Sequence, residues 1–218
     1  MKEKLLLSGY NRRGMGIHFY VPFAAVVFCA GIILLFAFRG AITVEFVCFA
    51  ANYILGPVSA WHVIFLYQPI FEEEGGEFVR SLPGYEKMVS PMRMIPFLAG
   101  YWLCVMGMIF CVFELIGFQN IEWLMILKIC ALSFFFSAMA YFAMAVWKNA
   151  GTVIGSVVSY VLLCAFLGDK IPFWMNMFMM TDDGNFLLIG AVLAAGMILT
   201  LSGRERAERD RGWAHRKY

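Results

Sequence analysis

Long apolar runs separated by short polar stretches dominate the chain. Six of these runs are long enough to cross the ~30 Å hydrocarbon core of a bilayer, which takes roughly 20 helical residues. The six runs are 19–38, 45–69, 94–116, 121–147, 151–168 and 186–202. Lipid offers no hydrogen-bond partners to the backbone, so a spanning segment is either a helix or a strand of a closed barrel. The runs are nearly continuous Leu, Phe, Met and Ala and lack the alternation of apolar and polar residues that barrel strands show. The pattern therefore predicts an all-α integral membrane protein with six transmembrane helices.

Composition supports a membrane protein and excludes several other classes. Hydrophobic residues make up 62% of the 218 residues and charged residues only 15%, whereas a soluble domain of this size is about half apolar. A secreted disulfide scaffold, a coiled coil, a disordered tail and a nucleic-acid-binding protein are all excluded. The six cysteines lie inside the apolar runs without paired-motif spacing, so we interpret them as small core hydrophobes.

The distribution of Lys and Arg predicts the orientation. An even number of spans puts both termini on one side, and fourteen basic residues then share that side: Lys2, Lys4, Arg12, Arg13, Arg80, Lys87, Arg93, Lys148, Arg204, Arg206, Arg209, Arg211, Arg216 and Lys217. The opposite side has only Arg39 and Lys170, and Lys128 lies inside the fourth run. Because basic loops stay in the cytoplasm, both termini and the 70–92 loop are expected to be cytoplasmic.

Two connections are longer than the others. The cytoplasmic loop after the second run reads FEEEGGEFVRSLPGYEKMVSPMR, and the outer connection after the fifth run reads DKIPFWMNMFMMTDDGN. The apolar piece 171–180 of the outer connection is too short to span and too apolar for water, which predicts a re-entrant or interfacial element. We divide the chain into an N-terminal cytoplasmic segment (1–18), a six-helix domain (19–202) and a basic tail (203–218). Charge pairs at i,i+4 predict that the tail extends the last helix.

Few ionisable side chains lie deep in the predicted helices. His62 follows a Gly56-Pro57 kink, and we interpret it as a helix-packing histidine, with proton or metal chemistry as the alternative. Lys128 could snorkel outward, pair with Glu114 or Glu122, or have a role in substrate binding or gating. This scarcity argues against transport driven by an ion gradient. The chain has no Gly-Lys pair and hence no Walker A motif, so the chain is expected not to be an enzyme and any ATP hydrolysis must occur on another chain.

The cytoplasmic loop carries the most specific motif. An acidic residue, Glu74, closes the second run, and Gly75-Gly76-Glu77-Phe78-Val79-Arg80-Ser81-Leu82-Pro83 follows. This segment resembles the membrane subunits of type-2 ABC exporters, in which a Gly-containing stretch leads to a short helix ending in Ser-Leu-Pro. It departs from that pattern by lacking an Arg after the closing acid and by having Gly-Gly for Gly-Thr or Gly-Ser. The alternative is a solvated charge run that caps a helix.

The resemblance implies a permease of the bacterial plasma membrane. Two permease copies, or a related pair, would work with two ATPase subunits that hold ATP and magnesium, while this chain holds no cofactor. The coupling residues would be Glu74, Glu77, Phe78, Val79, Leu82 and Pro83, with the apolar ones contributing most of the contact energy. The alternatives are a substrate-capturing subunit of a vitamin importer and a non-transporting membrane adaptor or sensor.

The outer connection suggests the cargo and a gate. Its Met-rich, aromatic surface and the absence of deep charges favour an amphipathic cargo, such as a hydrophobic peptide or a lipid-like molecule. Phe173, Trp174, Phe178 and Met179 are expected to form an apolar outer gate, with a simple anchor in the headgroup region as the alternative. In the fifth run, Gly151 and Gly155 form a small face that permits close helix contact within one subunit or between two.

Overall fold

The computed structural model describes residues 14–39, 44–72, 85–116, 123–167, 170–172, 175–178 and 186–214. All of its regular elements in these ranges are helical, and six helical stretches are long and apolar enough to cross a membrane. The elements are η1 (Gly16–Phe19), α2 (Val21–Phe38), α3 (Val44–Ala50), η2 (Ala51–Leu55), α4 (Gly56–Phe71), α6 (Tyr85–Val89), η3 (Pro91–Arg93), α7 (Ile95–Ile116), α8 (Trp123–Trp147), α9 (Ala150–Leu167) and α11 (Phe186–Ala214). The prediction of a six-helix membrane protein is confirmed at this level.

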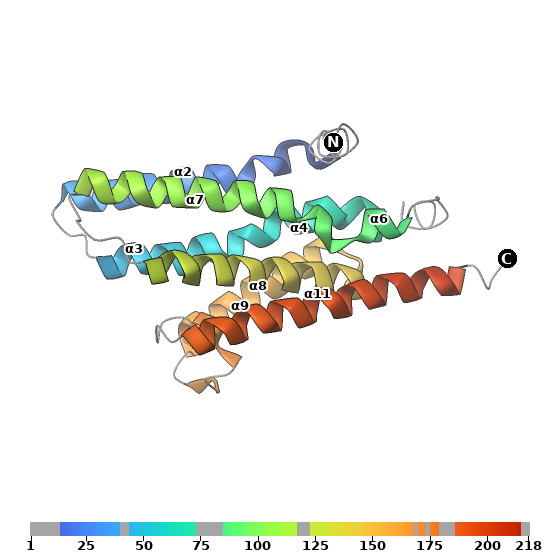
Figure 1. The fold of residues 1–218 in the computed structure, drawn as a ribbon. Coiled ribbons are helices and arrows are strands. Elements are labelled where there is room, and N and C mark those ends of the chain that lie inside the picture. The colour runs from blue at the N-terminus through green and yellow to red at the C-terminus, as the bar shows by residue number, and fades with distance from the viewer. Residues whose placement is uncertain are drawn as a thin grey trace.

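The helices lie side by side in three tiers (Figure 1). α8 occupies the middle, packed along α4 and α11, while α2 pairs with α7 on one side and α9 lies against α4 and α8 on the other. The larger core cluster joins α4, α6, α8, α9 and α11, and a second cluster joins α2, η2, α7 and the start of α8. The described chain begins and ends at the same end of the bundle, where α6 also lies. This common end is the one that the charge pattern predicts to be cytoplasmic.

The second span is not a uniform helix. It runs as α3, then a π-helical turn, η2, and then α4, in which Pro57 lies in the first turn. The Gly56 N–H donates to the Ala51 carbonyl, five residues back, which is the bond that defines a π-turn. Proline has no N–H for the helical ladder, so the break lies where the Gly56-Pro57 pair predicts a kink.

The last helix continues well past the apolar run. α11 extends to Ala214, so the first part of the predicted basic tail is the helical extension that its charge spacing indicated. The Arg204 guanidinium pairs with the Glu208 carboxylate at 2.7 Å, one of the predicted i,i+4 pairs. Both side chains are exposed, so this pair adds little stability.

Two glycines bring α11 close to α8. A Cβ on Gly203 would lie 2.9 Å from the Tyr141 ring and 3.1 Å from the Phe142 Cα. A Cβ on Gly196 would lie 2.8 Å from the Phe134 ring. Small residues at these positions allow the two backbones to approach, which is how helices pack in lipid.

Candidate functional site

The predicted coupling segment lies between two well-packed elements. Its residues Glu74, Glu77, Phe78, Val79, Leu82 and Pro83 all lie outside the described residues. The described chain stops at Glu72, just after α4, and resumes at Tyr85, the first residue of α6. Tyr85 and Val89 are both 1% exposed, whereas Glu86 and Lys87 are exposed, so α6 packs one face against the bundle.

Tyrosine hydroxyls fix α6 to three spanning helices. Tyr67 of α4 donates to the Ser90 carbonyl at 2.6 Å, and Tyr141 of α8 donates to the Val89 carbonyl at 2.7 Å. Tyr85 itself points to the Ala207 carbonyl of α11 at the longer distance of 3.5 Å. We call Tyr67, Tyr85 and Tyr141 the tyrosine clamp. The clamp therefore connects the stretch from Tyr85 to Ser90 with α4, α8 and α11 through hydrogen bonds.

Arg93 reinforces the same place. Its guanidinium donates to the Met88 carbonyl and lies 5.7 Å from the centre of the Tyr67 ring. A guanidinium at this distance from an aromatic face is attracted to the ring. The positive charge therefore holds the end of α6 against the tyrosine that anchors it.

The other side of the coupling segment is tied to α9. The Glu72 carboxylate accepts from the Gln68 amide at 2.7 Å and from the Ala150 backbone N–H at 3.4 Å. Asn149 caps the same helix, accepting from the Thr152 N–H at 2.8 Å. A carboxylate at a helix N-terminus is favoured by the helix dipole. Both flanks of the coupling segment are thus linked to spanning helices.

Sequence reasoning missed the tyrosine clamp. The available signal was the placement of Tyr67 and Tyr141 near those ends of two apolar runs that the charge pattern predicts to be cytoplasmic. A buried tyrosine hydroxyl needs a hydrogen-bond partner. In an apolar run, such a tyrosine therefore indicates that a backbone carbonyl without a helical partner lies close by. The partner carbonyls could not be identified, because they belong to a loop far away in the sequence.

His62 lies in an aromatic cluster between α4 and η1. It is 2% exposed, and its Nε2 lies 2.9 Å from the Phe19 carbonyl, to which the ring N–H donates. Phe19, Phe23 and Phe97 surround the imidazole with ring centres 5.2 to 6.0 Å away. This is the hydrogen-bonded, helix-packing role that we predicted for His62.

Hydroxyl groups connect α4 to α8 next to the π-turn. The Ser59 Oγ lies 2.7 Å from the Gly56 carbonyl and 2.8 Å from the Ser133 carbonyl, which share its single O–H as acceptors, and it accepts from the Ser137 Oγ at 3.2 Å. In the same region the Tyr101 hydroxyl of α7 donates to the Leu55 carbonyl at 2.6 Å. The irregular turn is therefore held from two sides by side-chain hydrogen bonds.

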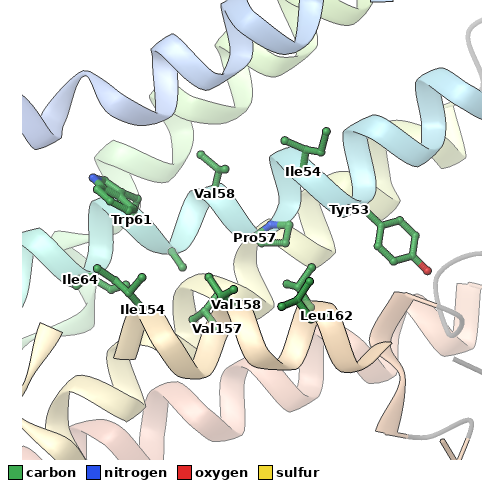
Figure 2. A pocket seen from close by; sticks show the side chains of 12 residues that line it. Tyr53, Ile54, Pro57, Val58, Trp61, Ile64, Ile154, Val157, Val158 and Leu162 are labelled. Carbon is green, nitrogen blue, oxygen red and sulfur yellow. The ribbon is translucent and has the colours of Figure 1, made fainter. Parts of the chain in front are cut away.

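An apolar groove runs between η2–α4 and α9 (Figure 2). Its volume is about 340 Å³, within the ~300–1,000 Å³ of typical ligand sites. Tyr53, Ile54, Pro57, Val58, Ala60, Trp61, Ile64, Ile154, Val157, Val158, Val161 and Leu162 form its walls. Figure 2 shows the α9 side chains Ile154, Val158 and Leu162 pointing toward the η2–α4 wall.

Of the four predicted gate residues, the structure describes only Phe178. This side chain is fully buried, stacked on the Tyr53 ring at 4.2 Å and packed against Phe136 near the middle of α8. Tyr160 anchors the same stretch by donating to the Met175 carbonyl at 2.8 Å and accepting from the Met177 N–H. The other gate residues, Phe173, Trp174 and Met179, lie outside the described residues.

The remaining predicted polar positions are separate from these sites. Lys128 is half-buried in the second turn of α8, and Glu114 is exposed near the end of α7. Gly155 is exposed and would meet no atom within 4 Å with an added Cβ, so α9 does not use it for contacts among the described residues. Within the described ranges, no group of three His, Cys, Asp or Glu side chains is placed to hold a metal ion.

Comparisons with known proteins do not assign this chain to a family. No protein-family model, curated protein or solved structure matches the chain.

Proposed function

We propose that the chain is the membrane-spanning permease subunit of an ATP-driven exporter of the ABC type. Two permeases, identical or related, would assemble in the bacterial plasma membrane with two ATPase subunits that bind ATP and magnesium. The cargo would be amphipathic, a hydrophobic peptide or a lipid-like molecule. The observation that carries the proposal is the Glu74–Pro83 motif, together with its place in the sequence between α4 and α6; α6 lies at the end of the bundle where the described chain begins and ends.

The described contacts support a mechanical role for this segment. A loop that receives force from an ATPase must pass it to the transport path, and a loosely attached loop would absorb the movement instead. Here α6 is held by the tyrosine clamp, and Glu72 links the end of α4 to the start of α9. A push on the coupling segment would therefore move four spanning helices together.

The composition of the spans supports an amphipathic cargo. The described parts of α2, α4, α8 and α9 present mostly apolar side chains with a few hydroxyls, Lys128 is the one Lys or Arg among them, and the His62 imidazole is already hydrogen-bonded to the Phe19 carbonyl. A small hydrophilic solute would need polar partners in such a path, whereas an apolar chain needs none.

The decisive experiment is purification from native membranes in a mild detergent. We expect a subunit with a Walker A motif to co-purify, and its ATPase rate to depend on the permease. Replacing both Phe78 and Leu82 with Ser should weaken this association more than Glu73→Gln, because apolar anchors contribute more to such contacts than exposed charges. The Gln variant serves as the matched control in the same segment.

Two outcomes would contradict the proposal. A stable monomer that carries a bound small molecule and no ATPase would favour the capture subunit of a vitamin importer. Crosslinks from positions 78 and 82 that never reach an ATP-binding chain would remove the coupling role and leave a membrane adaptor or sensor.

The outer gate needs a separate test, because Phe178 also packs the bundle. Phe178→Ala would cost about 3–5 kcal/mol of stability through the cavity alone, so its effect on transport is ambiguous. Trp174→Ala in reconstituted vesicles is therefore the test variant. Ion leakage or altered export with an unchanged melting temperature supports a gate, and unchanged permeability and export leave only an anchor.

A further inference from the structure

The groove keeps α9 apart from η2–α4 along the middle of both helices. Ala60 and Val157 on its floor are 2% and 6% exposed, whereas Val158 and Leu162 on the α9 rim are each 49% exposed. Protein interiors are normally close-packed, and side chains that line a gap lose the contacts that a closed interface would supply. A groove of about 340 Å³ between two apolar walls therefore leaves room for a closer arrangement of the two helices.

α9 is connected to α8 through a strained residue. α8 ends at Trp147 and α9 begins at Ala150, so only Lys148 and Asn149 connect the two helices. Among the described residues, Lys148 is the one non-glycine residue with a positive φ, of 54°. This left-handed conformation is unfavourable for a residue with a Cβ, and such strain concentrates at sites that switch between conformations. A rotation of the Lys148 backbone would turn the whole of α9.

Both walls of the groove can bend at a defined point. The Asn149 side chain accepts from the Thr152 N–H at 2.8 Å and its carbonyl accepts from the Val153 N–H at 3.1 Å, so α9 is regular from its first turn. Bending therefore concentrates at the element end, where hinge residues commonly lie. On the opposite wall, the π-turn η2 and Pro57 interrupt the regular helix beside the groove.

The α9 wall also has a small residue that the open groove leaves without contact. Gly155 precedes Leu162 by seven residues, so the two lie on the same side of α9. A Cβ added to Gly155 would meet no atom within 4 Å. Glycine on a membrane helix allows another helix to approach closely, and the observed arrangement does not use this capacity.

A polar contact next to the hinge belongs to the open arrangement. The Glu72 carboxylate, at the end of α4, accepts from the Ala150 N–H at 3.4 Å and from the Gln68 amide at 2.7 Å. The helix dipole favours a negative charge at this N-terminus of α9. Near the outer end of the groove, the Phe178 ring stacks on the Tyr53 ring at 4.2 Å, a contact that is less directional than a hydrogen bond.

We propose that α9 is a hinged helix that turns about Lys148 between the open groove seen here and a closed form in which it packs on η2–α4. Closing releases the strain at Lys148, and Glu72 stabilises the open form by binding the start of α9. The hinge does not rest on the proposed export function. Under that function, the coupling segment begins directly after Glu72, so its movement would break this contact and favour closing.

A distance between the outer ends of the two walls measures the equilibrium. Phe49 of α3, which continues into η2, and Phe166 of α9 are 55% and 81% exposed and lie outside the groove lining. Each is replaced by p-acetylphenylalanine, which carries a nitroxide on its ketone, so that the native cysteines stay in place. Double electron–electron resonance on the full-length protein in lipid nanodiscs should show a major distance that fits the open groove and a minor, shorter one.

Two pairs of variants change the equilibrium in opposite directions. Glu72→Ala should raise the ratio of short to long distances roughly two- to fivefold, the usual effect of a charge at a helix end. Glu205→Ala removes an exposed carboxylate of α11 and is its control. Gly155→Leu fits the open form but obstructs closing, so it should remove the short distance. Gly190→Leu, at another position where an added Cβ meets no atom, should leave it unchanged.

The hinge residue has its own sign test. Glycine adopts a positive φ without strain, whereas a β-branched residue strongly disfavours it. Lys148→Gly should therefore favour the long distance and Lys148→Val the short one. Both variants lose the same charge, so their difference reports the backbone alone. Lys148→Gly compared with wild type is informative even if Lys148→Val fails to fold.

Three results would overturn the proposal. A single distance, unchanged in wild type and every variant, would show that α9 is fixed and that the groove stays open to lipid. Equal populations in Lys148→Gly and Lys148→Val would remove the hinge from Lys148. Equal shifts in Glu72→Ala and Glu205→Ala would show a general effect of charge. None of these measurements involves an ATPase, so their failure is separate from a failure of the proposed export function.

Discussion

At the scale of single residues, steric fit outweighs hydrogen bonding in holding these helices together. Hydrogen bonds between membrane helices are worth about 0.6 kcal/mol on average, so the Ser59–Ser133 bond contributes modestly. An atom forced into a tightly packed contact costs about 1–3 kcal/mol. At Gly203 the opposing atoms include the backbone Cα of Phe142. Stability should therefore be more sensitive to a change at Gly203 than to the loss of the Ser59–Ser133 hydrogen bond.

A series of alanine substitutions in α11 tests this ranking. Gly203→Ala should lower the melting temperature most, because its Cβ would lie 3.1 Å from backbone that cannot rotate away. Gly196→Ala should have a smaller effect, because its clash is with the Phe134 ring and its distance to the Phe135 Cα is an ordinary 3.5 Å. Gly190→Ala, which meets no atom within 4 Å, is the control and should be neutral or stabilising. The order is measured by thermal unfolding in detergent, and equal melting temperatures would refute it.

The sequence indicated some of these residues and not others. His62 could be interpreted correctly because a lone imidazole in an apolar run needs a hydrogen-bond partner, and the Phe19 carbonyl supplies one. The glycines that matter for packing could not be identified, because Gly151 and Gly155 have the familiar spacing while Gly196 and Gly203 make the close contacts. Spacing along one helix does not reveal which partner helix approaches it.

At the scale of elements, tyrosine hydroxyls fasten the two long connections to opposite ends of the bundle. Tyr141 binds the Val89 carbonyl after the coupling segment, and Tyr160 binds the Met175 carbonyl in the outer connection. Both carbonyls lie where the regular hydrogen bonds of a helix are interrupted. The tyrosine hydroxyl therefore takes the place of a backbone N–H donor. Each connection should therefore depend on its own tyrosine.

Hydrogen exchange can show this dependence with two reciprocal variants. Tyr141→Phe should accelerate exchange of the amides at 85–93 and leave 175–178 unchanged, and Tyr160→Phe should do the opposite. Each loss leaves a carbonyl without its donor at a cost of about 1 kcal/mol, which corresponds to roughly fivefold faster exchange through local opening. Each variant is the control for the other. Faster exchange in both segments of either variant would indicate general loosening instead.

The helix bounds followed well from the apolar pattern, but the internal form of the second span did not. The predicted run 94–116 agrees with α7 (Ile95–Ile116), and 121–147 agrees with α8 (Trp123–Trp147). The π-turn η2 was not predicted, because a single wide turn leaves no trace in hydropathy. It depends on partners from other helices, such as Tyr101 at the Leu55 carbonyl.

At the scale of the whole molecule, apolarity does not mark the centre of the bundle. The apolar stretch of α2 has the highest mean hydropathy of the six spans, yet only 22% of it is buried inside the protein. The corresponding stretch of η2–α4 has the lowest mean hydropathy, and 61% of it is buried. Lipid is as apolar as the protein core, so a lipid-facing helix has no reason to be less hydrophobic than a central one. Serine, histidine and tyrosine are better markers of the centre, because they need partners that only protein can supply.

The orientation of the whole bundle is the broadest prediction and the most direct to test. The structure puts the described ends and α6 at one end, and the charge pattern assigns fourteen of the seventeen Lys and Arg residues to that side. Positive loops resist translocation, so this end should be cytoplasmic. A fluorescent protein fused after Tyr218 should fluoresce, and alkaline phosphatase inserted after Gln119, between α7 and α8, should be active outside the membrane. The same phosphatase inserted after Lys148 is the control and should be inactive. The opposite pattern would invert the topology and would place the Glu74–Pro83 segment out of reach of any cytoplasmic ATPase.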